Sequence, residues 1–385
     1  MRVLLIGNYA NNKQESMQRF AELMSRLLAQ CGHEVRLVVP RARLGKLRAE
    51  EGGIGKWLGY IDRFVLWIPQ LRRDVRWADF VHVCDHVNAV YLPLVSCKPY
   101  LVTCHDMLAI RSALGDIPSQ RVSWTGRIYQ RWILASLKRA RRVVCVSLET
   151  QQDFLRVTGV PAERTEVVPN GLNYEFEPMK TDDAAPHLRN LGLDSIGGFL
   201  LHVGGNQWYK NRSGVLEIFE AIARTPGFER LELVMAGKQW SSELRSMVSQ
   251  SQFKRRVREI VGASNEELQA LYSTARALIF PSLYEGFGWP IIEAQACGCL
   301  VFTSDRAPMN MIGGNGAMYF NPGDICSARA LIVPYVRDGD VSGKVSAALR
   351  NAGFTNARKY SHASMLNGYR AAYRKAQTAL ANRGS

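Results

Sequence analysis

Two glutamates flank a glycine-rich turn toward the C-terminal end of the chain. Residues 281–297 read PSLYEGFGWPIIEAQAC, in which Glu285 precedes a Gly-Phe-Gly turn and Glu293 lies in the apolar segment after it. Glycines let the backbone approach a ligand closely, and Pro290 suits the first turn of a helix. The start of such a helix can bind an anion such as a diphosphate, while the carboxylates accept hydrogen bonds from nearby hydroxyl groups.

A lysine follows a second glycine turn in the segment LLHVGGNQWYKNR, residues 200–212. The ammonium group of Lys210 is a point charge on a flexible stem, suited to neutralising a leaving diphosphate. Arg212 or the amide of Asn206 would add further donors. The alternative interpretation, that Lys210 and Arg212 only begin a solvated helix, stays open at this stage.

Polar side chains also follow apolar runs in the first half of the chain. His105 and Asp106 come just after the strand-like Tyr100–Thr103. The segment VHVCDHVN also ends a strand, and four of its residues could contact an acceptor: His82, Asp85, His86 and Asn88. Ligands of open α/β sheets bind at the carboxyl ends of strands, so these residues are candidates for a site. The turn of Gly7 and Asn8 has the same placement. It lacks the full G-x-G-x-x-G pattern, which argues against a dinucleotide there.

Apolar runs that are typical of parallel strands alternate with amphipathic segments throughout the chain. The strands are expected at Val3–Ile6, Glu34–Val39, Phe80–Val83, Tyr100–Thr103, Arg142–Val146, Gly198–Val203, Leu231–Ala236 and Ala277–Phe280. Helices are expected at Ser16–Cys31, Trp124–Arg141 and Met365–Ala381. The polar stretch Glu175–Ala185, followed by Pro186, is expected to be a linker. The predicted domains are residues 1–175, 186–354 and 355–385, the last a terminal helix.

The chain has 385 residues and a net charge of +15, which is unevenly distributed. Residues 1–175 hold 25 Lys and Arg against 16 Asp and Glu, residues 176–354 hold 18 of each, and residues 355–385 hold 6 against none. No apolar run reaches the length of a membrane span or of a signal peptide. The 8 cysteines show no metal-binding spacing, so a cytoplasmic protein with reduced core cysteines is expected.

The Glu285-x7-Glu293 spacing resembles the signature of retaining GT-B glycosyltransferases, particularly glycosyltransferase family four. Further counterparts are GGNGAMYFNPGD (residues 313–324), VVCVS (residues 143–147) and VVPNGL (residues 167–172), so the resemblance covers nearly the whole chain. It implies two Rossmann-like α/β lobes that face a central cleft, with the C-terminal helix packing back on the first lobe.

The same resemblance implies a role for each candidate residue. Glu285, His105 and Lys210 would be catalytic: Glu285 would contact the transferred sugar, His105 would orient the donor and Lys210 would hold the diphosphate. The donor site would comprise Gly205, Asn206, Lys210, Arg212, Val261, Gly286, Phe287, Gly288, Trp289 and Glu293, with Glu293 at the ribose. The acceptor side would comprise Gly7, Asn8, His86 and Asp106. Gly205 stands where this family often has arginine, which leaves the second phosphate cation undecided between Arg212 and neutral donors.

The expected activity is transfer of a sugar from a UDP- or GDP-sugar to a glycan or lipid-linked acceptor, in surface polysaccharide or glycolipid synthesis. No Asp-x-Asp motif suited to a sugar nucleotide is present, so neither a metal nor another cofactor is expected. One alternative is an NAD-dependent sugar-nucleotide oxidoreductase or epimerase, which would need the missing glycine fingerprint. Another is a nucleic-acid-binding protein, suggested by the basic stretch Lys138–Arg142 but without any recognisable reader motif.

The charge division also predicts that the first lobe docks on an anionic membrane at its cytoplasmic face. A basic terminal helix on the first lobe would leave the donor lobe neutral and concentrate the positive charge on one side. The aromatic and basic residues expected at this surface are Trp57, Trp67, Arg72, Arg73 and Arg76. The alternatives are a basic surface that only repels itself, or a soluble acidic acceptor.

Overall fold

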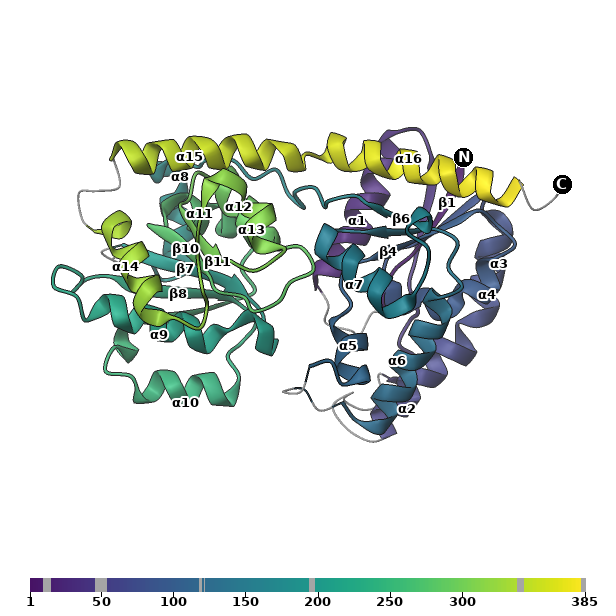
Figure 1. The fold of residues 1–385 in the computed structure, drawn as a ribbon, viewed down its shortest axis with the longest axis horizontal. Coiled ribbons are helices and arrows are strands. Elements are labelled where there is room, and N and C mark those ends of the chain that lie inside the picture. Colours follow the sequence, from purple (N-terminus) through teal and green to yellow (C-terminus); the bar gives the residue numbers. More distant parts are fainter. Residues whose placement is uncertain are drawn as a thin grey trace. The chain divides into compact units, whose positions relative to one another are not determined.

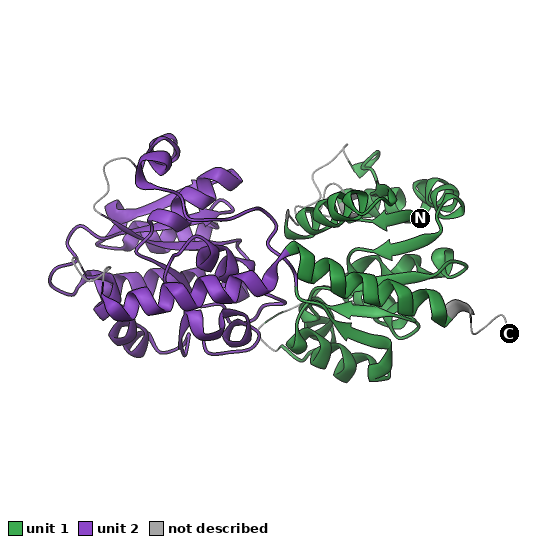
Figure 2. Ribbon diagram, turned by 90° about the horizontal axis from the view of Figure 1, so that it is seen from above, with its two compact units in different colours: residues 1–169, 362–385 green, residues 170–361 purple. Residues whose placement is uncertain are grey.

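The computed structural model divides the chain into two compact units, which Figure 2 colours separately. Unit 1 consists of Met1–Pro169 and His362–Ser385, and unit 2 of Asn170–Ser361. The structure describes residues 1–9, 15–45, 54–117, 120, 122–193, 198–337 and 343–381. Each unit is built on one parallel sheet of six strands, as the alternation of apolar runs and amphipathic segments predicts.

The sheet of unit 1 has the strand order β2-β1-β3-β4-β5-β6. Figure 1 labels its strands β1, β4 and β6. Its strands are β1 (Arg2–Ile6), β2 (Glu34–Val38), β3 (Phe80–Val83), β4 (Tyr100–Cys104), β5 (Val143–Cys145) and β6 (Thr165–Val167). Its helices are α1 (Glu15–Gln30), α2 (Ile54–Ile61), the π-helix η2 (Asp62–Leu66), α3 (Ile68–Trp77), the 3-10 helix η3 (His86–Tyr91), α4 (Leu92–Val95), α5 (Leu108–Leu114), α6 (Trp124–Leu137), α7 (Leu148–Thr158) and α16 (His362–Ala381).

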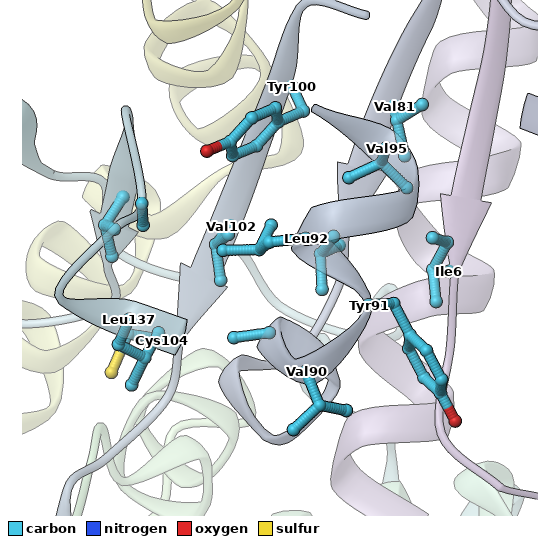
Figure 3. Close-up of a cluster of buried hydrophobic side chains, with 14 of the residues drawn as sticks. Ile6, Val81, Val90, Tyr91, Leu92, Val95, Tyr100, Val102, Cys104 and Leu137 are labelled. Carbon is cyan, nitrogen blue, oxygen red and sulfur yellow. The ribbon is translucent and has the colours of Figure 1, made fainter. Parts of the chain in front are cut away.

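The central strands of unit 1 are covered on both faces, which explains their continuous apolar sequence. Every residue of β3 and β4 is buried. Figure 3 shows Tyr100 and Val102 along β4, together with Leu92 and Val95 of the short helix α4, in the same hydrophobic cluster. Full burial of one such apolar side chain stabilises the fold by about 1.5–3 kcal/mol.

Helix α16 belongs to unit 1 and packs against its sheet, which confirms the predicted return of the terminal helix. The buried ring of His82 joins the two: its Nδ1 lies 2.8 Å from the hydroxyl of Tyr373 and its Nε2 lies 2.8 Å from Oγ1 of Thr103. That threonine oxygen also lies 3.0 Å from the hydroxyl of Tyr369. His82, which the sequence offered as a possible acceptor contact, therefore contacts Tyr373 of this helix through Nδ1 and is linked to Tyr369 only through Thr103.

The sheet of unit 2 has the strand order β12-β11-β10-β7-β8-β9, again all parallel. Its strands are β7 (Phe199–Gly204), β8 (Glu232–Gly237), β9 (Val257–Val261), β10 (Ala277–Phe280), β11 (Val301–Ser304) and β12 (Ala317–Phe320). Its helices are α8 (Thr181–Asn190), α9 (Arg212–Ala223), α10 (Ser242–Gln250), α11 (Asn265–Thr274), α12 (Trp289–Ala296), α13 (Met309–Gly313), α14 (Ile325–Val336) and α15 (Lys344–Ala357).

The segment expected to be a linker is partly helical, which corrects that expectation. Helix α8 begins at Thr181 and contains Pro186, and it packs on α11. Asp182 and Asp183 lie in its first turn, where carboxylates interact favourably with the positive end of a helix. This packing stabilises the helix despite the hydrogen bond that the proline removes. The first boundary between the units lies at Pro169 and Asn170, before this helix.

The cysteines form no disulfide, and five of them are buried: Cys84, Cys104, Cys145, Cys297 and Cys299. Cys97 and Cys326 are exposed, so the description of the cysteines as core residues does not hold for these two. Among the described residues, no helix combines the length and the apolar character needed to cross a membrane.

Candidate active site

Two neighbouring strands of unit 2, β7 and β10, deliver the predicted donor-site residues at their carboxyl ends. The loop after β7 carries Lys210 and leads into α9, and the loop after β10 carries Glu285 and leads into α12. Two hydrogen bonds join the loops: the Asn211 side chain donates to the carbonyl of Pro281 at 3.1 Å, and the backbone of Leu283 donates to the carbonyl of Tyr209 at 2.7 Å. The two candidate segments therefore form one continuous site.

The Glu285 carboxylate binds the Lys210 ammonium directly. The distances from Nζ are 2.6 Å to Oε1 and 2.9 Å to Oε2, and the side chains of Lys210 and Glu285 are 17% and 7% exposed. A partly buried pair interacts more strongly than a pair in water, because nearby solvent screens it less. Sequence reasoning predicted both residues, but it assigned them to separate contacts and missed their ion pair.

The turn before α12 has the backbone that its glycines allow. Gly288 adopts φ of 105° as the residue preceding the helix, a conformation that side chains other than glycine rarely adopt. Pro290 lies in the first turn. Phe287 and Trp289 are buried, and the Trp289 indole donates to the carbonyl of Gly171 at 2.9 Å. These anchors fix the direction of a helix start that can bind an anion.

Glu293 lies inside α12 with its carboxylate buried and engaged on both oxygens. The Asn173 amide donates to Oε1 at 3.0 Å, and the Tyr272 hydroxyl donates to Oε2 at 2.8 Å. Burial and the adjacent Glu293 carboxylate raise the pKa of Tyr272, which keeps its hydroxyl protonated as a donor.

Arg212 is the first residue of α9, and its guanidinium is buried rather than solvated. Its Nη1 donates to Oδ1 of Asn206 at 2.6 Å and to the carbonyl of Lys238 at 2.9 Å. Among the described residues, neither Nε nor Nη2 has a hydrogen-bond partner. Burial lowers the pKa of Arg212 to about 10, at which it is still charged at neutral pH. The expectation of a possible solvated helix start is wrong for Arg212.

The remaining predicted donor residues lie around the same edge of the sheet. Gly205 and Asn206 follow β7, and the Asn206 amide also donates to the carbonyl of Gln239, 2.6 Å away. Val261 ends β9 and is 57% exposed. Ser264 caps α11 in a reciprocal capping box with Glu267, which accounts for the carboxylates at that helix start.

In unit 1, the first predicted group of polar residues forms a buried cluster at the carboxyl ends of β1 and β3. The Asn8 amide donates to Oδ2 of Asp85 at 2.6 Å and accepts from the Asn88 amide at 2.7 Å. Nδ1 of His86 lies 3.0 Å from Oδ1 of Asp85, as an ion pair without good hydrogen-bond alignment. The Asn88 amide also donates to the carbonyl of Gly7, at 3.2 Å, so both predicted turn residues belong to the cluster.

The charges of this cluster support one another despite burial. Burial disfavours a charged imidazole, but the Asp85 carboxylate outweighs it and raises the pKa of His86. Burial likewise opposes the charge of Asp85, yet the adjacent His86 ring and the Asn8 amide hold the pKa of that carboxyl far below its usual range. The sequence drew attention to Asp85 and Asn88, but it did not predict that both of them form hydrogen bonds with Asn8.

His105 lies beside this cluster, after β4, and its ring is held in one tautomer. Nε2 is 2.8 Å from the carbonyl of Cys84, so this nitrogen donates the proton and Nδ1 is an acceptor. Within the described part of the chain, Nδ1 is buried without a hydrogen-bond partner. Burial lowers the pKa of His105, so the ring is neutral at pH 7. Asp106 accepts a hydrogen bond from the backbone N–H of Leu108 at 3.0 Å.

Two residues that sequence reasoning missed complete the unit 2 site, namely Asn173 and Tyr272, the partners of Glu293. Asn173 directly follows the quoted segment VVPNGL, so proximity to a known motif was an available signal. Nothing in the sequence pairs Tyr272 of α11 with Glu293 of α12. Among the described residues, no group of three or more His, Cys, Asp or Glu side chains is arranged to hold a metal ion.

The two parallel sheets, each with its polar residues at the strand ends, define a two-lobe α/β protein of the GT-B fold. The crystal structure of Anabaena HepE in complex with UDP and glucose has the same fold, with a TM-score of 0.70 and 16% identity, covering 95% of this chain and 97% of that one. Residues 17–176 match the Glycosyltransferase Family 4 domain, and residues 187–346 match the Glycosyl transferases group 1 domain. The chain therefore belongs to the family 4 glycosyltransferases and is a sugar-transferring enzyme.

Two curated relatives are O-antigen mannosyltransferases. O-antigen chain mannosyltransferase B of Escherichia coli is 26% identical over 292 residues, which cover 74% of this chain and 74% of the relative. O-antigen chain mannosyltransferase RfbU of Salmonella typhimurium is 29% identical over 203 residues, which cover 52% of this chain and 53% of the relative. The second match thus spans about half the length of that relative.

Proposed function

We propose that this glycosyltransferase moves a hexose from a nucleoside diphosphate sugar to a glycan or lipid-linked acceptor, with retention, in surface polysaccharide or glycolipid synthesis. The observation that carries the proposal is the Lys210 ammonium, held at 2.6 Å by Glu285 beside the glycine turn that opens α12. Two relatives are O-antigen mannosyltransferases, which supports the acceptor class, and the structural neighbour in complex with UDP and glucose supports the donor class.

Lys210 supplies the charge that the leaving diphosphate needs. As the glycosidic bond to the diphosphate breaks, negative charge grows on the departing oxygen, and a fixed cation at that point stabilises the transition state. Glu285 sets the position of the ammonium and contacts the transferred sugar. The buried Arg212, with Nε and Nη2 lacking partners among the described residues, adds a second cation at the same loop. Arg212 thus fills the role left open by Gly205.

Glu293 binds the ribose, and its hydrogen bonds with Asn173 and Tyr272 fix its rotamer. Gly286 to Trp289 approach the diphosphate, and Val261 lies against the base. In unit 1, Nδ1 of the neutral His105 ring accepts a hydrogen bond from a hydroxyl group of the donor sugar. The Gly7, Asn8, His86 and Asp106 group faces the acceptor. No metal takes part in this proposal, since the side-chain and backbone donors provide the charge stabilisation.

The test is the release of nucleoside diphosphate from GDP-mannose, UDP-glucose and related donors, with a bacterial glycolipid extract as acceptor. Glu285→Gln is expected to lower turnover about 10- to 150-fold, the effect of losing a charge-assisted hydrogen bond, with a smaller change in donor affinity. Glu243→Gln, an exposed acid in α10, is the matched control. Wild-type turnover in a folded Glu285→Gln variant would remove Glu285 from the mechanism.

We further propose that unit 1 docks on an anionic membrane through exposed apolar residues of α2, η2 and α6. We call these residues the aromatic surface: Trp57 (56% exposed), Ile61 (39%), Val65 (60%), Trp124 (70%), Ile128 (56%) and Trp132 (44%). Ring contacts join α2 and η2 to α6: the ring centroids of Tyr60 and Tyr129 are 5.8 Å apart, and those of Phe64 and Trp132 are 4.9 Å apart. Membrane interfaces favour such aromatic side chains.

The charge of the same unit supports an anionic bilayer as the partner. Arg127 and Arg131 of α6 are exposed beside the aromatic surface, and each cation near such a membrane contributes on the order of 1 kcal/mol. One residue that the sequence predicted at this surface, Trp67, is not there. Trp67 is only 3% exposed and its ring packs on Tyr91, with centroids 5.0 Å apart, so it belongs to the core. Arg72, Arg73 and Arg76 are exposed on α3.

Co-sedimentation with vesicles tests the docking. The wild-type protein is expected to pellet with phosphatidylglycerol vesicles at low salt and to stay in solution with phosphatidylcholine. The double variant Trp124→Ser/Ile128→Ser should lose this binding, whereas Leu148→Ser/Val167→Ser, which changes exposed apolar residues elsewhere on unit 1, should keep it. Equal binding to neutral vesicles, or full binding of the Trp124→Ser/Ile128→Ser variant, contradicts the docking proposal.

A further inference from the structure

Unit 1 contains a cavity of about 500 Å³, and none of its lining residues is among those proposed for the transfer reaction. It lies at the amino ends of the strands: Tyr100 begins β4, Arg142 directly precedes β5, and Arg164 directly precedes β6. In a parallel sheet all amino ends lie at one edge and all carboxyl ends at the other. The cavity is therefore at the opposite edge of the sheet from His105 and from the Asn8 cluster.

Positive charge dominates the cavity lining. Four arginines, Arg139, Arg141, Arg142 and Arg164, line it together with a single carboxylate side chain, that of Glu163. Like charges that share a partly enclosed space repel one another, and a bound anion relieves that repulsion. The helix expected from the sequence at Trp124–Arg141 includes most of this basic stretch. In the structure α6 ends at Leu137, so Arg139, Arg141 and Arg142 lie in the connection to β5.

Most of this charge is not neutralised by the described part of the chain. Arg142 donates to the carbonyl of Glu163 and lies 3.8 Å from Glu166, a carboxylate that also pairs with Lys375 at 3.3 Å. Within the described residues, Arg139 and Arg164 take part in no ion pair. Nη1 of Arg141 is buried without a hydrogen-bond partner there. A buried, unpaired donor of a charged group is costly, so such a group in a cavity indicates a missing acceptor.

The Arg141 guanidinium is held in place by a tyrosine. Its central carbon lies 5.6 Å from the centre of the Tyr100 ring, and the Arg141 backbone N–H donates to the Tyr100 hydroxyl at 3.2 Å. A cation that is already positioned loses little side-chain entropy when an anion binds. Leu92, Pro93 and Ala379 give the cavity an apolar wall beside the guanidinium groups.

We propose that this cavity binds an organic phosphate, with the phosphate on the arginines and its carbon skeleton against the apolar wall. Guanidinium groups match the oxygens of phosphate bidentately, and a volume of about 500 Å³ lies within the usual range of small-molecule sites, roughly 300–1,000 Å³. The phosphate comes either from a free phosphorylated metabolite or from a phospholipid headgroup, which share this chemistry. The proposal does not depend on the proposed transferase mechanism, because all the lining residues belong to unit 1.

Isothermal titration with glycerol 3-phosphate tests the proposal without any activity measurement. The exposed lining residues are changed in Arg139→Gln/Arg164→Gln, and the same charge is removed outside the cavity in Arg26→Gln/Arg230→Gln, also at exposed positions. Loss of the guanidinium contacts should weaken binding at least about tenfold, whereas the control should bind like the wild type. Lys210→Ala should also bind like the wild type, because its change lies in the donor site of unit 2.

Three results would overturn the proposal: no binding by the wild-type protein, equal affinity of Arg139→Gln/Arg164→Gln, or binding lost in Lys210→Ala and retained in the lining variant. Vesicle co-sedimentation then separates the two sources of phosphate. If Arg139→Gln/Arg164→Gln binds neither glycerol 3-phosphate nor phosphatidylglycerol vesicles while the control binds both, the ligand is a headgroup. If only glycerol 3-phosphate binding is lost, the ligand is a free phosphate ester.

Discussion

Replacing Glu293 by alanine should destabilise unit 2 strongly, because it leaves two buried donors without an acceptor. The carboxylate accepts from Asn173 at 3.0 Å and from Tyr272 at 2.8 Å, and its side chain is almost fully buried. A hydrogen bond to a charged group contributes about 1.5–3 kcal/mol, so the two together predict a loss of about 3–6 kcal/mol in the free energy of unfolding. Glu293→Gln keeps the volume and one acceptor oxygen, and should lose less.

Urea unfolding at pH 7, followed by tryptophan fluorescence, measures this loss. Combining Glu293→Ala with Tyr272→Phe in a double-mutant cycle isolates one of the two bonds, with an expected coupling of about 1.5–3 kcal/mol. Glu243→Ala, which removes an exposed acid of α10, should change stability by no more than about 0.5 kcal/mol. If Glu293→Ala is no less stable than this control, or if the effects of the two substitutions in the cycle are additive, the hydrogen bonds of Glu293 do not stabilise unit 2.

Three further predictions concern metal, pH and backbone. Turnover should persist in excess EDTA, and loss of activity that magnesium restores would contradict the metal-free proposal. Burial lowers the pKa of His82 to about 3, so the unfolded chain binds the extra proton below about pH 6.5. Stability should therefore fall as pH drops from 6.5 toward 3, more steeply than in His82→Gln by up to about 1.4 kcal/mol per pH unit; parallel slopes would refute this. Gly237→Ala should destabilise more than Gly262→Ala in urea unfolding, because a Cβ at Gly237 would meet the Gly204 carbonyl oxygen at 2.1 Å, whereas Gly262 has nothing within 4 Å; equal losses would contradict this.

Much of the fold was predictable because apolar runs in parallel sheets are read directly from sequence. The strands Phe80–Val83 and Ala277–Phe280 have the predicted bounds, since both are buried throughout and bordered by polar or turn residues. Helix α8 was not predicted, because Pro186 and a polar composition favour a linker. Its stability comes from packing on α11, a contact that composition does not encode.

The donor-site residues were predictable as types but not as partners. The glycine turn at Gly288 and the charge of Lys210 are local features, and the structure places both at the carboxyl ends of adjacent strands. The bond from Asn173 to Glu293 joins residues 120 positions apart, so local patterns carry no signal for it. Burial also depends on tertiary contacts that local patterns do not show: Trp67 was expected at the surface, yet the fold packs it on Tyr91.

Binding of nucleoside diphosphate sugars by isothermal titration tests the central claim most directly. At least one of GDP-mannose and UDP-glucose should bind the wild-type enzyme, and should bind equally to Lys254→Ala, which changes an exposed lysine of the same unit. Lys210→Ala should weaken binding about 10- to 150-fold, since it removes the phosphate cation and leaves the Glu285 carboxylate uncompensated. Failure of the folded wild-type protein to bind any sugar nucleotide, or unchanged affinity in Lys210→Ala, would contradict the account.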